Sequence, residues 1–180
     1  MTGPMPPYAL FVLVDDIDAD YLNDALTRAY KRNFEAAWEH KYLVIGGYEN
    51  APKKLENAYP EGTKAPIHAD FRSLFIGNTP EECALSLQNA PEVVALNREY
   101  FLFVDQFSKE EDTIQICRVE QNIGTKRLHV EYFPKPTGDS TVRIATSSGL
   151  KFDEALQRYQ RNRIRDGRPD RSKGVPYGQA

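Results

Sequence analysis

Four acidic residues close together near the start of the chain have types and spacing that could bind a metal ion: Asp15, Asp16, Asp18 and Asp20. They follow an apolar run at residues 8–14 that we expect to form a strand. In α/β proteins, side chains at the carboxyl ends of parallel strands line the crevice where ligands bind. The spacing of Asp16, Asp18 and Asp20 matches the start of a calcium loop, but Tyr21 stands at the sixth position, where that loop has glycine, and Thr27 at the twelfth, where it has glutamate. We therefore take these three aspartates as candidate ligands of a hard cation such as magnesium, and helix capping in a solvated turn as the simpler interpretation.

His68 is the histidine best suited to acid–base chemistry, because Asp70 is close enough in sequence to orient its imidazole. The other two histidines, His40 and His129, form no pair with metal-ligand spacing. Asp105 ends an aromatic run and is a second candidate for a polar group in a pocket. If the protein is an enzyme, His68, Asp105 and Asp16 are therefore its candidate catalytic residues.

Two further features have a structural interpretation that we prefer to a functional one. Residues 147–149, Ser-Ser-Gly, precede an expected helix, whose positive end could hold an anion. They lack the glycines of a dinucleotide fingerprint and the lysine of a phosphate-binding loop, so we expect helix capping. Cys83 and Cys117 are too far apart for a zinc pair and stand in apolar patterns, so we expect two buried free thiols. No cofactor is predicted.

Charge is unevenly distributed along the chain. Residues 161–180 carry six basic side chains and two acidic ones, a balance of +4, whereas the whole chain has a net charge of −3. The other residues therefore carry −7. An arginine-rich segment can bind phosphates, but the acidic body and the absence of a nucleic-acid motif make nucleic acid an unlikely partner. The alternatives are a tail that folds back on the acidic body, one that binds an acidic protein surface, and a solvated tail.

The elements that must position these residues are organised around residues 100–119. Two runs rich in aromatic and β-branched residues, 100–107 and 113–119, suit strands, and the polar residues 108–112 between them suit a loop. We interpret them as a central hairpin, with Leu102 and Val104 on one face and with Phe101, Phe103 and Asp105 on the other.

The remaining elements alternate in the first half of the chain. We expect strands at residues 8–14, 42–48 and 71–76, and helices from Asp18 or Asp20 to about His40, at 52–59, at 80–88 behind a capping box, and at 91–97. After the hairpin we expect a strand at 127–133, a turn at 134–139, a strand at 142–145 and a last helix. This order predicts an α+β fold with a single mixed sheet, a C-terminal antiparallel meander and helices packed against the sheet. The predicted domain spans residues 1–160, and residues 161–180 form a basic, flexible tail.

Composition favours a soluble, cytoplasmic protein without a membrane partner, because no apolar run approaches the ~20 residues that cross a bilayer and the N-terminus lacks the pattern of a secretory signal. Two classes of function remain open. The first is a non-catalytic protein-interaction domain, with self-association as a homodimer as one form of interaction. The second is a small enzyme or small-molecule-binding protein with an aromatic-lined pocket near the ends of the first strand and the central hairpin.

Overall fold

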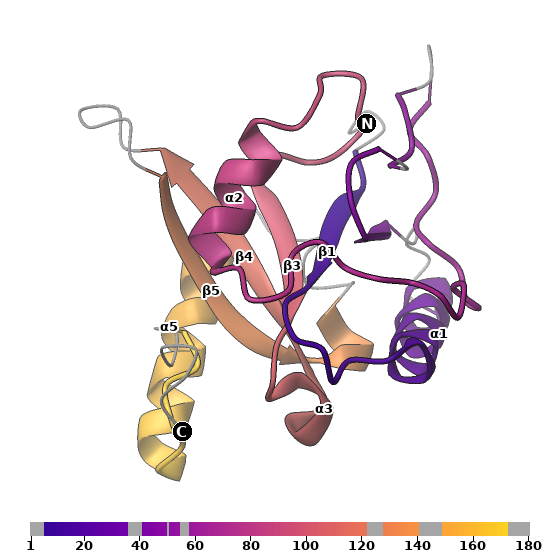
Figure 1. Cartoon of the computed structure of the whole chain (residues 1–180). Coiled ribbons are helices and arrows are strands. Elements are labelled where there is room, and N and C mark those ends of the chain that lie inside the picture. Colours follow the sequence, from indigo (N-terminus) through magenta and orange to yellow (C-terminus); the bar gives the residue numbers. More distant parts are fainter. Residues whose placement is uncertain are drawn as a thin grey trace.

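A five-stranded mixed sheet forms the centre of the computed structural model, which describes residues 6–35, 41–49, 51–54, 58–121, 128–140 and 149–172. The strand order is β2-β1-β3-β4-β5 (Figure 1). β1 (Tyr8–Val12) pairs in parallel with both β2 (Tyr42–Ile45) and β3 (Tyr100–Val104). β4 (Thr113–Gln121) and β5 (Leu128–Pro136) extend the sheet as an antiparallel meander. The predicted fold class is therefore confirmed.

Helix α1 (Ala19–Glu35) connects the two parallel strands β1 and β2. The Asp18 carboxylate caps it, because Oδ1 of Asp18 accepts a hydrogen bond of 2.8 Å from the Tyr21 amide. Apolar side chains at helical spacing, Leu22, Leu26 and Ala29, are buried against the sheet. The aspartate cluster thus marks the boundary between β1 and α1.

Helix α2 (Pro80–Gln88) begins at the capping box that the sequence predicted. The Thr79 hydroxyl accepts from the Glu82 amide, and the Glu82 carboxylate accepts from the Thr79 amide. Its buried residues include Cys83, Ala84 and Leu87, which lie in the same core as Phe101 and Phe103. The helix therefore covers the face of the sheet that carries the hairpin phenylalanines.

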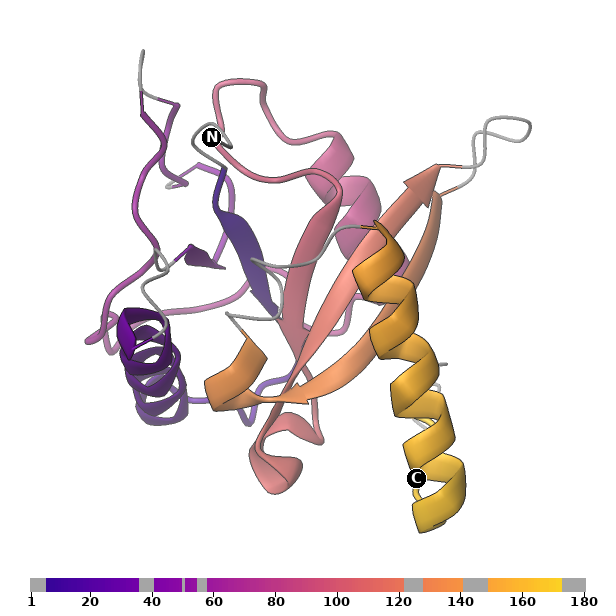
Figure 2. The same cartoon turned by 180° about the vertical axis from the view of Figure 1, so that it is seen from behind.

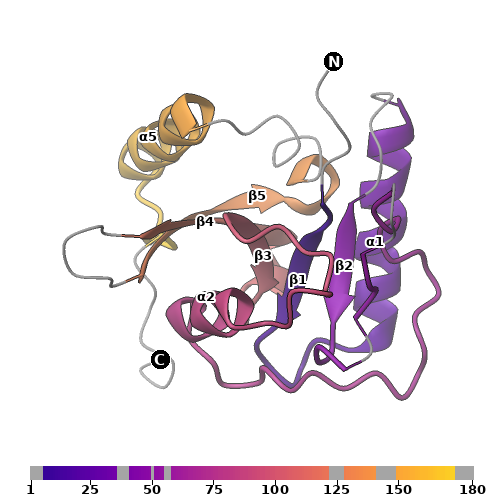
Figure 3. The same ribbon diagram turned by 90° about the horizontal axis from the view of Figure 1, so that it is seen from above.

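The two faces of the sheet have separate cores. One contains Phe11, Phe101, Phe103 and the buried side of α2. The other contains Leu10, Leu102 and Val104 with side chains from α1 and from α5 (Gly149–Asp166). Figure 2 shows α1 and α5 on the face opposite α2, and Figure 3 shows the sheet between α2 and α5. The alternation predicted for the hairpin is confirmed by this division.

Arg118 connects α5 to the sheet. Its side chain, only 9% exposed, forms ion pairs with Glu131 of β5, with Asp153 of α5 at 2.7 Å and with Glu120 at 3.0 Å. The guanidinium also lies over the Phe152 ring, 4.6 Å from its centroid. A charged contact therefore supplements the apolar packing that holds α5 in place.

Several predicted elements are wrong. The described parts of residues 52–59 and 91–97 contain no helix, and Lys53 forms an isolated bridge with Val94. Residues 71–73 are irregular and residues 74–77 form a turn, where a strand was predicted at 71–76: the Leu74 amide donates to the Gly46 carbonyl, and Phe75 is buried in the core. In each case tertiary contacts prevail over local propensity.

The hairpin connection and the end of the meander also differ from expectation. Residues 108–111 form a short helix, α3 (Ser108–Glu111), that ends at Asp112 with a left-handed φ of 52°. β5 continues through Pro136, where a turn was predicted, and a helical turn follows at residues 137–140. Proline is tolerated because β5 is an edge strand, where half of the amides need no ladder partner. The strand predicted at 142–145 lies outside the described residues.

Helix α5 continues past the domain boundary predicted at residue 160 and ends at Asp166. Gly167 then adopts a φ of +65°, with hydrogen bonds from Gly167 to Ile164 and from Arg168 to Arg163 that form a Schellman cap. The chain therefore turns back at Gly167, and residues 173–180 of the predicted tail lie outside the described part. Among the described helices, none has the length and apolar character that crossing a membrane requires.

Candidate functional site

The carboxyl-terminal edge of the parallel strands is the candidate site, because the chain leaves β1 and β3 there in different directions. After β1 it enters α1 and continues to β2 on one side, whereas after β3 it enters α3 and continues to β4 on the other side. Such a change of direction is a topological switch point, where the loops of open α/β sheets leave a crevice. The residues after β1 include the aspartate cluster, and those after β3 include Asp105 and α3.

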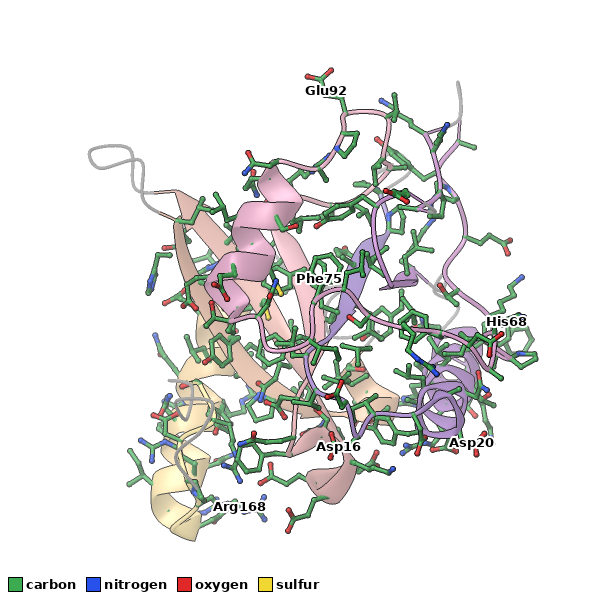
Figure 4. The ribbon with its side chains drawn as sticks, in the orientation of Figure 1. Asp16, Asp20, His68, Phe75, Glu92 and Arg168 are labelled. Atoms are coloured by element: carbon green, nitrogen blue, oxygen red, sulfur yellow. The ribbon has the colours of Figure 1, made fainter. Side chains whose placement is uncertain are left out.

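The aspartate cluster is tied to α3 by one lysine. Nζ of Lys109 lies 3.0 Å from Oδ2 of Asp18 and 3.4 Å from the Asp16 carbonyl oxygen. The Tyr21 amide and the Lys109 ammonium lower the pKa of Asp18. Asp16 and Asp20 are exposed, with Asp16 beside α3 and Asp20 at the start of α1 (Figure 4). Of the candidate ligands, Asp18 therefore serves as a helix cap and an ion-pair partner.

No group of three or more histidine, cysteine, aspartate and glutamate side chains suited to a metal ion occurs within the described ranges, which include Asp16, Asp18 and Asp20. The three aspartates thus lie close together in the sequence but do not form a set of metal ligands in the described part of the structure.

Asp105 is 7% exposed and joins three elements. Its Oδ1 accepts a hydrogen bond of 2.9 Å from the Phe107 amide and one of 3.3 Å from the Ser108 hydroxyl, and Gln115 of β4 approaches Oδ2 at 3.4 Å. Burial raises the pKa of Asp105, although these hydrogen bonds and the charge of Arg171 act in the opposite direction. The carboxyl group therefore fixes the turn from β3 into α3.

Arg171 docks on this edge from the other end of the chain. Its guanidinium carbon lies 3.3 Å from the centroid of the Phe107 ring, and its Nη2 lies 2.6 Å from Oε1 of Glu111. The backbone amide of Arg171 donates to the Tyr159 hydroxyl at 2.8 Å, so α5 supports the same segment. Sequence reasoning missed Phe107, Glu111 and Arg171 as a site. The only signal was the contrast between the acidic body and the basic tail.

His68 lies away from Asp16, beside α1 (Figure 4). The preceding amide, of Ile67, donates to the Asn23 side chain of α1 at 2.7 Å. Nδ1 of His68 accepts from the Asp70 amide, and the His68 and Asp70 side chains are 82% and 87% exposed. The structure therefore brings Asp16 and Asp105 to one edge and places His68 elsewhere, where solvent surrounds its imidazole.

His68 lines a cavity of about 570 Å³ along the edge strand β2. Phe71 and Leu74 form its apolar wall. The wall packs so closely that a Cβ atom on Gly46 would stand 2.8 Å from the Arg72 carbonyl oxygen, and one on Gly47 would stand 2.9 Å from the Leu74 side chain. The glycine pair that ends β2 is thus explained by a close approach of the chain.

The remaining sequence candidates lie on other elements or outside the described residues. His129 lies on β5, and His40 and residues 147–148 lie outside the described residues. Cys83 and Cys117 are buried and free, as expected. Burial raises the pKa of Cys83 to about 12 and also raises that of Cys117, which makes both thiols poor nucleophiles.

A comparison with protein-family models, one with curated proteins and one with solved structures each found no match to this chain.

Proposed function

We propose that this protein is a non-catalytic protein-interaction domain, and that the carboxyl-terminal edge of its parallel strands receives an arginine-bearing segment of a protein partner. The observation that supports this function is the docked Arg171, because the chain itself presents an arginine to this edge. A stacked guanidinium and a carboxylate bond are the two interactions by which proteins commonly recognise arginine.

The charge of the edge favours a basic partner. Exposed carboxylates follow both strands: Asp15, Asp16, Asp18 and Asp20 after β1, and Glu110, Glu111 and Asp112 after β3. Lys109 and Arg28 form ion pairs with some of them. Acidic groups remain in excess, and such a surface attracts basic segments and repels acidic ones.

Enzyme chemistry receives less support from the arrangement of the candidates. Catalysis by His68, Asp105 and Asp16 would need the three groups within reach of one substrate. Oδ1 of Asp105 is engaged by its own turn and Oδ2 by Gln115 of β4, and His68 lines a cavity along β2. A pocket near the ends of β1 and the hairpin remains the alternative proposal.

An arginine analogue tests the interaction function on the full chain. Because Arg171 is tethered, it competes at an effective concentration in the millimolar range. We therefore expect the variant Arg171→Ala to bind Nα-acetyl-arginine amide saturably in NMR titrations, with a Kd on the order of millimolar, and the unsubstituted chain to bind it more weakly, with an apparent Kd raised about twofold or more by competition from Arg171. The neutral analogue Nα-acetyl-citrulline amide measures the contribution of charge.

The matched control is Arg165→Ala, since Arg165 pairs only with the adjacent Asp166 in the described part of the chain. This variant should behave like the unsubstituted chain. Adding Glu111→Gln to Arg171→Ala should abolish the binding. If Arg171→Ala does not bind the analogue, or if citrulline binds equally well, the proposed recognition of arginine is wrong.

A further inference from the structure

A second cavity, of about 250 Å³, lies between the end of β5 and helix α5. Its apolar side is formed by Phe133, Pro134, Pro136 and Ala155, and its polar side by residues of α5 and of the turn that follows it. It is distinct from the edge that carries Arg171, although Tyr159 contributes to both places.

Positive charge is concentrated around this cavity in a protein whose net charge is −3. Four basic side chains line it against a single acidic one, Asp166. The basic residues are Lys135, Arg158, Arg163 and Arg168. The positive charge around the cavity therefore contrasts with the net negative charge of the chain.

Two of the lining charges are already compensated. Asp166 pairs with Arg165, which lies 2.8 Å away and is 73% exposed, and this bond lowers the pKa of Asp166. Arg163 pairs with Asp170 at 3.2 Å. Within the described ranges, the guanidinium groups of Arg158 and Arg168 form no ion pair, although the charge of Arg168 also contributes to lowering the pKa of Asp166. The uncompensated charge at the cavity is therefore positive.

The backbone explains how Arg168 comes to this cavity. The Schellman cap at Gly167 reverses the chain, and the Arg168 amide donates to the Arg163 carbonyl at 2.9 Å. The helix dipole accounts for basic residues in the last turn of α5, namely Arg163 and Arg165. It does not account for Arg158, two turns earlier, or for Arg168, beyond the helix. Figure 4 shows Arg168 past the end of α5.

We propose that this cavity binds the phosphate group of a small phosphorylated molecule, with Arg158 and Arg168 as its principal ligands. Arginine forms bidentate hydrogen bonds with phosphate, and Asn162 adds an amide donor at the cavity wall. The prolines and Phe133 offer an apolar surface to the rest of the ligand. The volume is below the range of drug-sized sites, so the ligand is small. This inference does not depend on the proposed interaction function.

The test uses the full chain, with inorganic phosphate and phenyl phosphate as probes. Binding is measured by calorimetry and by the rise in Tm relative to sodium chloride of equal ionic strength. Arg158→Gln and Arg168→Gln should each weaken binding about tenfold or more, since a hydrogen bond to a charged group contributes about 1.5–3 kcal/mol. The matched control is Arg161→Gln. This change removes the same charge from the same helix, but Arg161 lines a different cavity.

Binding that is lost in the two cavity variants and retained in Arg161→Gln supports the site. Circular dichroism and the Tm without phosphate show whether each variant is folded, and both arginines are exposed, so folding should persist. Equal weakening in all three variants would indicate a general charge effect and overturn the site. Failure of both probes to bind would overturn it as well. A single-stranded oligonucleotide that binds where the two probes do not would replace it with a nucleic-acid surface.

Discussion

Replacing Arg118 with methionine should loosen α5 from the sheet. Methionine retains most of the apolar stem, so the change removes the guanidinium and leaves three carboxylates near one another. These belong to Glu120, Glu131 and Asp153.

The expected loss in the free energy of unfolding follows from how exposed each ion-pair partner of Arg118 is. Glu120 and Asp153 are about half exposed, at 50% and 46%, so each pair contributes less than about 1 kcal/mol. Glu131 is 27% exposed, and its bond to Arg118 contributes about 1–2 kcal/mol after a discount for solvent. Stacking on Phe152 adds about 0.5–1 kcal/mol. We therefore expect Arg118→Met to lower the free energy of unfolding by about 2–3 kcal/mol.

Urea unfolding followed by far-UV circular dichroism measures this loss. A chain of this length should also lose about 5–10 °C in Tm. Asp153→Asn, alone and combined with Arg118→Met, should show a coupling energy of about 0.5–1 kcal/mol. The control Arg165→Met removes an exposed guanidinium and should change stability by less than about 0.5 kcal/mol. A loss below about 1 kcal/mol for Arg118→Met, or an equal loss for the control, would refute the reasoning.

Three further changes test local features of the fold. Thr79→Ala breaks the capping box of α2 and should cost about 1 kcal/mol in urea unfolding. Gly46→Ala places a methyl group 2.8 Å from the Arg72 carbonyl oxygen and should lower the free energy of unfolding by about 1–3 kcal/mol. The control Gly138→Ala, with no atom within 4 Å of the added Cβ, should be neutral or slightly stabilising. Equal losses in the two variants would contradict the close approach at Gly46. Because burial raises the pKa of Asp105, the folded state holds that proton more tightly than the unfolded state, so this group makes stability fall as the pH rises above the ordinary value of 3.8. Asp105→Asn should therefore gain stability relative to the unsubstituted chain as the pH rises, and a constant difference in urea unfolding across that range would contradict the raised pKa.

The parts of the fold that sequence reasoning found are those with strong local patterns. The capping box at Thr79 specifies the start of α2, and helical spacing of apolar residues specifies α1. Alternation assigned Phe101 and Phe103 to one face of the hairpin. These features depend on neighbours in the sequence, so they are visible without the fold.

The elements that were missed depend on contacts distant in sequence. Residues 71–76 have the composition of a strand, but Phe75 fills the core, and the Leu74 amide bonds to Gly46. Residues 52–59 begin like a helix, but Lys53 instead bridges to Val94. The local pattern of each segment favours the predicted element, but contacts distant in sequence determine the structure that it adopts.

Of the candidate site, sequence reasoning named only aspartates. Asp16, Asp18 and Asp105 follow strands, which places them at one edge once the sheet is known. Arg171 joins that edge only because Gly167 reverses the chain after α5, and a single glycine in an arginine-rich segment does not reveal that reversal from sequence alone.

Four arginines of the C-terminal segment make three kinds of contact, and this division determines how the proposals can be separated. Arg163 and Arg165 pair with aspartates of their own segment, Arg171 docks on Phe107 and Glu111, and Arg168 lines the cavity beside β5. A chain ended at Asp166 would remove Arg168 and Arg171 together, so loss of either binding activity would have two explanations. Single substitutions avoid this. Arg171→Ala should leave phosphate binding unchanged, and Arg168→Gln should leave the docking of Arg171 unchanged, because the two guanidinium groups serve different surfaces of one ordered turn.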